Sequence, residues 1–234
     1  MAHISTDNTI SKFYDDIAFP GYYTIEQLDG YGTPIENLYL NAIDQQLGHN
    51  QTVLDAGCGT GLTTNLFARR HTTSKFTGVD FAKSVDWATT FAKKNNISNV
   101  TYQKCDLTKY TTEENFDVVI CQGVLHHIPE YQLALSTLMG RVKDNGTLIL
   151  GLYHPWGKLV KKLANIDYQS TVLYKDQEQN PFESSFTYKQ VEQMTPGFKI
   201  IQAMPNALNT VSIPAFFNYR NGGLVIYILK KEQL

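Results

Sequence analysis

The stretch Val53–Gly61 reads VLDAGCGTG and decides the fold. Its first residues favour a strand, and Gly57, Gly59 and Gly61 follow at alternate positions before an apolar helical pattern. Glycines at such positions let the backbone turn sharply and approach a ligand without side-chain obstruction. A dinucleotide-binding loop has the spacing G-x-G-x-x-G, which would require its third glycine at Leu62. The observed G-x-G-x-G spacing therefore disfavours a loop for NAD.

From Gln51 onward, short β-rich runs alternate with helical patterns. We expect strands at residues 51–55, 76–80, 100–105, 116–121, 147–152, 198–203 and 224–229. A helix is expected at about 60–70, a second with Ser84 as its cap, and a third with Pro129 in its first turn. Asp144-Asn145-Gly146 indicates a turn before the fifth strand. This alternation predicts an α/β fold, a doubly wound and mostly parallel sheet with helices on both faces.

Composition and charge narrow the class of protein. The chain has 234 residues, of which 42% are hydrophobic and 18% charged, the balance of an ordered globular domain. The net charge of −2 and the absence of a long basic stripe argue against nucleic acid as an obligate partner. The sequence contains neither a signal peptide nor a run of apolar residues long enough to span a membrane. We therefore expect no membrane association.

The cysteines and histidines give no sign of a metal centre. Cys58, Cys105 and Cys121 are odd in number and lack the CxxC spacing, which suits a reducing compartment such as a bacterial-type cytoplasm. All three follow or end strands, where small buried hydrophobes are more common than nucleophiles. We expect no metal, because no ligand set has the spacing of a metal site.

The glycine loop and the elements after it resemble the class I methyltransferases that use S-adenosylmethionine (SAM). The resemblance runs from about residue 53 to 152 and includes Asp80 after the second strand, Asp106 after the third, and FDVVICQGVLHHIPE at 116–130. It resumes with SFTYKQVEQMTPGFKI at 185–200. The resemblance implies the seven-stranded Rossmann-like methyltransferase fold, with an N-terminal helical lid and an insertion after the fifth strand.

This organisation predicts a single domain over residues 1–234. Its parts would be a lid at 1–48, a SAM-binding core at 49–152, an acceptor cap at 153–196 and C-terminal strands at 197–234.

The resemblance also assigns roles to residues of the core. Asp80 lies 19 residues after Gly61 and matches the residue that accepts hydrogen bonds from the ribose hydroxyls. Asp106 matches the residue that accepts from the adenine amino group, although either aspartate could simply form a turn after its strand. The complete set of expected SAM-binding residues is Tyr14, Asp55, Gly57, Cys58, Gly59, Asp80, Phe81, Asp106, Leu107, Cys121 and Gln122.

Methyl transfer needs positioning more than covalent chemistry, and a base only when the acceptor is neutral. His126 and His154 follow the fourth and fifth strands and are the candidate bases, whereas His127 fits a structural role better. The chain lacks the Asn/Asp-Pro-Pro-aromatic motif after the fourth strand, and Asn180-Pro181-Phe182 only imitates it inside the insertion. A small organic molecule methylated on O, N or C is the expected acceptor, and the protein is expected to be a monomer or homodimer.

Three other readings stay open. A relative of this fold could transfer another group from a SAM derivative, although no carboxylate cluster suggests a polyamine site. A non-catalytic partner subunit often loses the glycines or the ribose acid, and this chain keeps both. An NAD-dependent oxidoreductase is disfavoured by Leu62.

Overall fold

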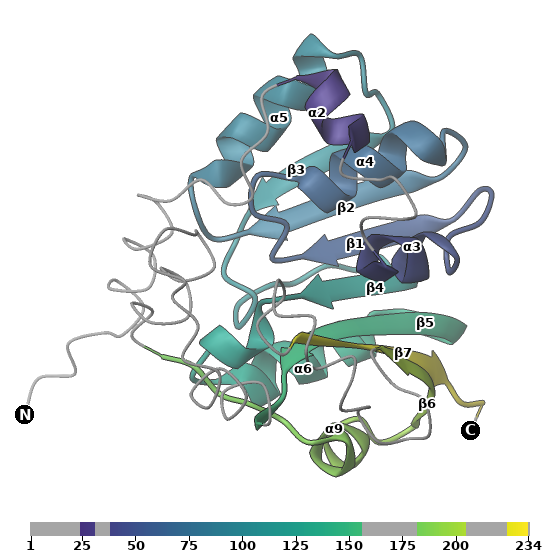
Figure 1. Ribbon diagram of the computed structural model, residues 1–234, viewed down its shortest axis with the longest axis vertical. Helices are drawn as coiled ribbons and strands as arrows, with labels where there is room; N and C mark the ends of the chain where they lie inside the picture. Colours follow the sequence, from purple (N-terminus) through teal and green to yellow (C-terminus); the bar gives the residue numbers. More distant parts are fainter. Residues whose placement is uncertain (1–23, 31–37, 156–181, 205–223, 234) are drawn as a thin grey trace, which may run out of the picture.

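The computed structural model describes residues 24–30, 38–155, 182–204 and 224–233. Its centre is a seven-stranded sheet with the strand order β3-β2-β1-β4-β5-β7-β6 (Figure 1). The strands are β1 (Thr52–Ala56), β2 (Lys75–Asp80), β3 (Val100–Lys104), β4 (Phe116–Gln122), β5 (Val142–Tyr153), β6 (Phe198–Met204) and β7 (Leu224–Lys231). Strands β1 to β5 pair in parallel, and β7 is antiparallel to both β5 and β6. The predicted doubly wound, mostly parallel sheet of seven strands is confirmed.

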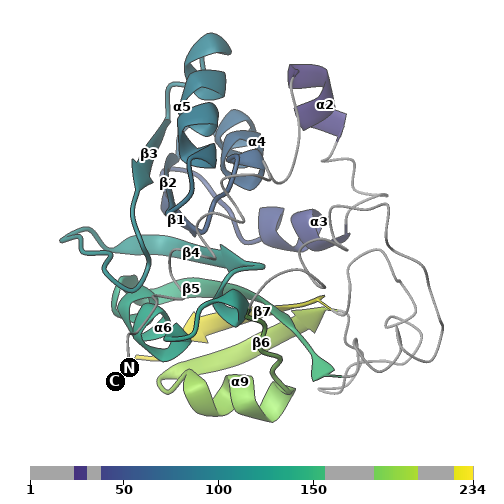
Figure 2. The ribbon, with the colours of Figure 1, turned by 90° about the vertical axis from the view of Figure 1, so that its left-hand side faces the viewer.

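Helices cover both faces of this sheet. They are α2 (Ile25–Gly30), α3 (Leu38–Asp44), α4 (Leu62–Arg70), α5 (Ser84–Lys94), α6 (Tyr131–Gly140) and α9 (Tyr188–Met194), with a short 3-10 helix η1 (Leu125–His127). Residues of α2 to α5 share one hydrophobic cluster, and residues of α6 and α9 share the other. Figure 2 shows α3 and α6 on opposite sides of the middle strands.

Alternation along the central strands explains how both faces become apolar. In β4, Val118 and Ile120 belong to the α3 face, whereas Val119 and Cys121 belong to the α6 face. Successive side chains of a strand point to opposite faces, so a strand covered by helices on both sides reads as a continuous apolar run. The run VVIC at 118–121 follows this rule.

Two helix starts and one turn differ from those that the sequence predicted. Ser84 is the first residue of α5 and makes no capping hydrogen bond; Lys83 is the cap residue. Helix α6 begins at Tyr131, so Pro129 precedes the helix and does not lie in its first turn. The turn expected at Asp144-Asn145-Gly146 is an irregularity inside β5, with Asn145 at φ 59° and a register shift against β4. The prediction of a free turn was wrong because a positive φ at asparagine fits an irregular strand as well as a turn.

The described part of the expected lid is a layer on the face of the sheet. Leu28 of α2 and Ile43 of α3 are fully buried in the cluster that contains α4. Ion pairs of 3.0 Å join Asp29 to Arg69 and Asp44 to Arg70, at the end of α4 away from the glycine loop. Tyr14 and the other residues of 1–23 lie outside the described residues, so a cover over the strand ends stays a prediction.

Candidate functional site

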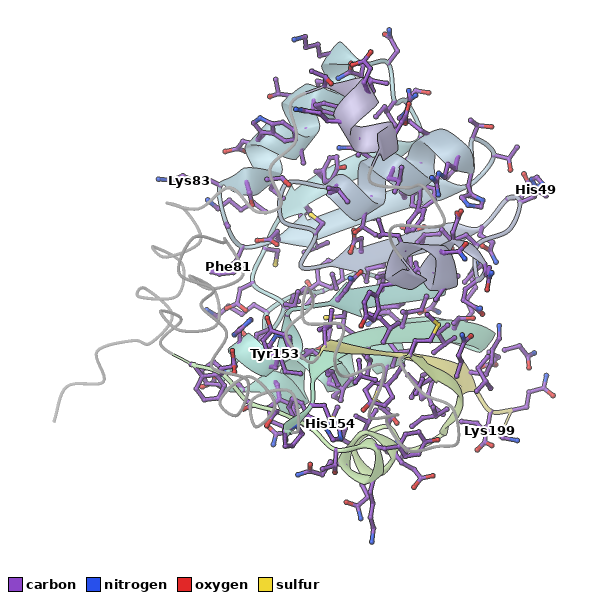
Figure 3. All side chains as sticks on the ribbon, in the orientation of Figure 1. His49, Phe81, Lys83, Tyr153, His154 and Lys199 are labelled. Atoms are coloured by element: carbon purple, nitrogen blue, oxygen red, sulfur yellow. The ribbon has the colours of Figure 1, made fainter. Side chains whose placement is uncertain are left out.

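The carboxyl ends of five parallel strands meet at one edge of the sheet. The chain leaves β1 toward β2 on one side and returns to β4 on the other, which opens a crevice between β1 and β4 at that edge. Figure 3 shows Phe81, Tyr153 and His154 at this edge, and His49 and Lys199 at the opposite one. Every expected site residue that the structure describes follows or ends one of β1 to β5, so the fold brings these residues to the same edge.

The glycine loop turns tightly between the end of β2 and the segment after β4. The N–H groups of Gly57 and Cys58 both donate to the Val79 carbonyl, at 2.7 and 3.1 Å. Gly57 has φ 80°, and a Cβ there would lie 2.2 Å from Cγ2 of Val124. A left-handed φ and this contact both exclude a side chain. The loop can therefore pack this closely against Val124 only because position 57 is glycine.

Asp80 connects the loop to the turn after β2. Its Oδ2 accepts from the Gly59 N–H at 2.8 Å, and its Oδ1 accepts from the Ala82 N–H at 2.9 Å. The residue is 7% exposed, and this burial raises the pKa of Asp80, although the backbone N–H groups act in the other direction. Asp80 thus organises the loop itself, as a turn former would, at the position where the resemblance implies a ribose contact.

A second buried carboxyl, Asp55, lies at the end of β1. The Thr64 hydroxyl donates to its Oδ2 at 2.6 Å. Burial raises the pKa of Asp55 to about 6, and the negative charge of Asp80 contributes in the same direction. Two buried carboxyls side by side disfavour a second negative charge and favour a cationic ligand. The edge therefore suits a positively charged molecule better than a phosphate.

Asp106 is more open and has local partners. Its Oδ1 accepts from the N–H and the hydroxyl of Thr108, both at 2.8 Å, and its Oδ2 pairs with Lys109 at 3.2 Å. Partial burial opposes ionisation, but these contacts outweigh it and hold the pKa of Asp106 below its usual value. Its neighbour Leu107 is buried, and Phe81 is partly buried on the adjoining loop. Asp106 is a turn former in this structure and is also ionised.

The cysteines of the site are not activated. Cys58 and Cys121 are buried, and burial raises the pKa of both thiols. The pKa of Cys105 is raised as well, first by burial and then by the charge of Asp106. A thiol needs a lowered pKa to act as a nucleophile at neutral pH. These side chains therefore pack as small hydrophobes.

An aromatic cluster occupies the ends of β4 and β5. The His126 and Tyr153 rings are in contact, with centres 3.9 Å apart and planes tilted by 31°, and His127 meets His126 edge-on at 4.2 Å. His127 Nδ1 lies 3.1 Å from the Phe182 carbonyl, so Nδ1 carries the proton because a carbonyl only accepts. His154 is buried too, and burial lowers its pKa. His126 and His154 thus lie at the expected edge, and His127 has a structural bond.

Sequence reasoning missed the segment that closes over this cluster. Residues 182–186 bond along η1 and the end of β5: Ser184 N–H donates to the His126 carbonyl at 2.7 Å, and Phe186 N–H to the Tyr153 carbonyl at 2.8 Å. Tyr153 itself was expected only as the start of the insertion, because a strand end next to an aromatic pattern gives no signal of a ring stack. Within the described ranges, no group of three or more His, Cys, Asp or Glu side chains could hold a metal ion.

Comparison with known proteins agrees with this geometry. The family model of the methyltransferase domain matches residues 47–197, which is more than half of the chain. The chain therefore belongs to this family, the class I methyltransferases.

Its relatives modify different atoms of different molecules. The chain is 33% identical to the (S)-coclaurine N-methyltransferase of Papaver somniferum over 133 residues, 56% of this chain and 37% of that protein. It is 32% identical to the ubiquinone biosynthesis O-methyltransferase of Rickettsia felis over 99 residues, 42% of this chain and 39% of that protein. The matches thus span less than half the length of these relatives.

One similar solved structure is the magnesium protoporphyrin IX methyltransferase of Synechocystis PCC 6803 with bound S-adenosylhomocysteine (SAH). It superposes with a TM-score of 0.65 at 17% sequence identity, and the match covers 97% of this chain and all of the other. This similarity supports the Rossmann-like methyltransferase fold.

Proposed function

We propose that the protein transfers a methyl group from SAM to O, N or C of a small organic molecule. The observation that carries this proposal is the glycine loop at the crevice between β1 and β4. Asp80 fixes this loop by accepting a hydrogen bond from the Gly59 N–H at 2.8 Å. The two relatives are an N-methyltransferase and an O-methyltransferase, which supports a small-molecule acceptor without choosing the methylated atom.

The residues present fit SAM as the cofactor. SAM carries a cationic sulfonium and no phosphate. The crevice offers two buried carboxyls, Asp55 and Asp80, beside a glycine loop in which position 57 has no room for a Cβ. Asp80 would accept from the ribose hydroxyls, and Asp106 from the adenine amino group. Gly57, Cys58, Gly59, Cys121 and Gln122 would line the methionine portion, with Asp55 orienting it. Tyr14, Phe81 and Leu107 complete the proposed set.

Each element then has a defined task in the transfer. SAM supplies a methyl group that already carries a good leaving group, so the protein must position the acceptor in line and exclude water. Positioning alone accounts for about 7–11 kcal/mol in favourable cases. The contact between the His126 and Tyr153 rings would give the edge an aromatic wall. His154, whose lowered pKa keeps the imidazole neutral, would accept a proton from the acceptor, with His126 as the second candidate.

We further propose that the protein acts in the cytoplasm as a monomer or homodimer, without nucleic acid. The net charge of −2 and the three free cysteines support this environment. In the described part of the chain, no helix has the length and apolarity to cross a membrane. A single domain with a lid at 1–48, a core at 49–152, a cap at 153–196 and final strands at 197–234 completes the proposal.

A turnover experiment tests the proposal. Purified protein is incubated with SAM and a panel of small amines, phenols and carboxylic acids, and mass spectrometry follows methylated product and S-adenosylhomocysteine (SAH). We expect at least one acceptor to gain a methyl group, and His154→Gln to slow its methylation without loss of SAH binding. Binding of SAH without turnover of any acceptor would favour the non-catalytic subunit instead.

A further inference from the structure

The side chain of Gln122 lies at the end of β4, beside the end of β5. Gln122 ends β4 and continues the face of Val118 and Ile120, which is the face covered by α3. It lies opposite Gly151 of β5 in the sheet register. A Cβ on Gly151 would lie 2.8 Å from Cγ of Gln122, much less than the separation of ordinary neighbours across two strands. The side chain therefore leans from β4 toward β5, away from the glycine loop on β1.

Gly151 makes this position possible. The same Cβ would also lie 3.0 Å from Cδ1 of Ile226 on β7, so any side chain at 151 would displace Gln122 from its place. A glycine in the interior of a strand weakens the sheet and marks a place where another group approaches closely. Here the approaching group is Gln122, through its Cα and its Cγ.

The Gln122 amide oxygen is buried and has no hydrogen-bond partner among the described residues. A buried acceptor left without a donor is costly, and native structures rarely keep one without a functional reason. The neighbouring positions leave room for a ligand: Gly123 has φ 77°, and a Cβ there would meet nothing within 4 Å. A polar atom of this kind at the edge of a crevice is poised to receive a donor from a bound molecule.

We propose that Gln122 selects the acceptor, by accepting through Oε1 a hydrogen bond from an N–H or O–H on the atom that is methylated. The inference rests on the proposed methyl transfer. The nucleophile's lone pair forms the new bond to the methyl carbon, the carbon–sulfur bond breaks, and sulfur keeps its electron pair. The amide only orients the nucleophile, because a neutral amide takes no proton, and the displaced proton passes to the proposed base, His154. Primary or secondary amines and hydroxyl compounds are therefore favoured over tertiary amines and ethers.

The test compares Gln122→Met, which keeps the length of the side chain, with Gln122→Glu, which keeps an acceptor oxygen. Gln103→Met, on an exposed position of β3, is the matched control. Aniline and catechol serve as probes at pH 8, where both are neutral, with N,N-dimethylaniline and veratrole as their blocked counterparts, which carry no N–H or O–H. Affinities are measured by calorimetry on protein saturated with SAH.

We expect wild type and the Gln103 variant to bind the two unblocked probes about tenfold more tightly than Gln122→Met does, the usual loss for one hydrogen bond. Gln122→Glu should recover part of that affinity, and the blocked probes should bind all the variants alike. SAH affinity should change less than threefold in each, because the Gln122 side chain leans toward β5 and only its backbone would line the methionine portion. The empty Gln122→Met protein should unfold at the same or a higher urea concentration than wild type, because an unpartnered acceptor has been removed.

Two results would overturn the inference while leaving the proposed function intact: wild type binding neither unblocked probe in the presence of SAH, or equal probe affinity in wild type and Gln122→Met. A large loss of stability in Gln122→Met would also count against it, because the amide would then serve the fold. Failure of wild type to bind SAH would instead remove the proposed function itself.

Discussion

Replacing Asp55 by asparagine tests how strongly the crevice disfavours a negative charge when no cation is bound. The carboxyl is 4% exposed at the end of β1, and it accepts a hydrogen bond from the Thr64 hydroxyl at 2.6 Å. Burial raises the pKa of Asp55 from the usual 3.8 to about 6. The variant keeps the shape of the side chain and an acceptor oxygen for Thr64, and it removes only the charge.

The magnitude follows from that pKa. The difference of about 2.2 corresponds to about 3 kcal/mol, since one pKa unit is worth about 1.4 kcal/mol. The folded pKa lies above the unfolded one, so between pH 3.8 and about 6 the folded state holds a proton that the unfolded state has lost. The contribution of Asp55 to the free energy of unfolding is therefore fully present below pH 3.8 and is lost as the pH rises through about 6.

Urea unfolding of the ligand-free protein between pH 5 and pH 8 measures this effect. We expect Asp55→Asn to gain stability relative to wild type as the pH rises, by roughly 1–3 kcal/mol at pH 8 after allowing for a weaker bond from Thr64. Asp80 is present in both proteins, so most of its own pH dependence cancels in the difference. A difference that does not vary with pH, or a variant less stable than wild type at pH 8, would refute the reasoning.

Asp117→Asn is the matched control, with the opposite sign. Burial acts against ionisation of Asp117, but the Thr52 N–H and the Lys143 ammonium outweigh it and lower its pKa. A lowered pKa contributes stability that is present at neutral pH and is lost as the pH falls through the folded value. This control should therefore lose stability at pH 8, by less than about 1 kcal/mol because the pair is partly exposed.

Three further predictions address other parts of the account. Gly57→Ala should cost about 1–3 kcal/mol of unfolding free energy and weaken SAH binding, because position 57 has a positive φ and a Cβ there would collide with Val124. Recovery of binding by a second change, Val124→Ala, would confirm the collision, whereas a single variant as stable as wild type would contradict the prediction. Thr187→Ala should cost about 1 kcal/mol in urea unfolding, since Thr187 and Gln190 form the capping box of α9; no change would show that the cap does not stabilise the helix. Because burial lowers the pKa of His154, the methylation rate of wild type should increase with pH up to a midpoint below pH 6.5 and then level off. An identical increase in His154→Gln would exclude this base.

The sequence predicted the sheet well because its signals are local. The run at 118–121 and the glycines at 57, 59 and 61 each specify their backbone without help from distant residues. The same holds for the edge at which Asp55, Asp80 and Asp106 meet, since parallel strands bring their carboxyl ends together.

Other features depend on contacts between distant segments, which no local pattern records. The burial of Leu28 and Ile43 makes α2 and α3 a layer of the fold, although the resemblance implied a lid over residues 1–48. The place of the Gln122 side chain depends on Gly151, 29 positions later in the chain and opposite it in the sheet. Such pairings become visible only once the register of β4 against β5 is known.

The most direct test of the central claim is calorimetric titration of the protein with SAH and, separately, with NAD, on wild type and Asp80→Asn. We predict that wild type binds SAH with micromolar affinity and does not bind NAD. Asp80→Asn should weaken SAH binding at least tenfold, because the charge-assisted bonds to the ribose are lost. Binding of NAD in place of SAH, or SAH binding that does not depend on Asp80, would contradict the account.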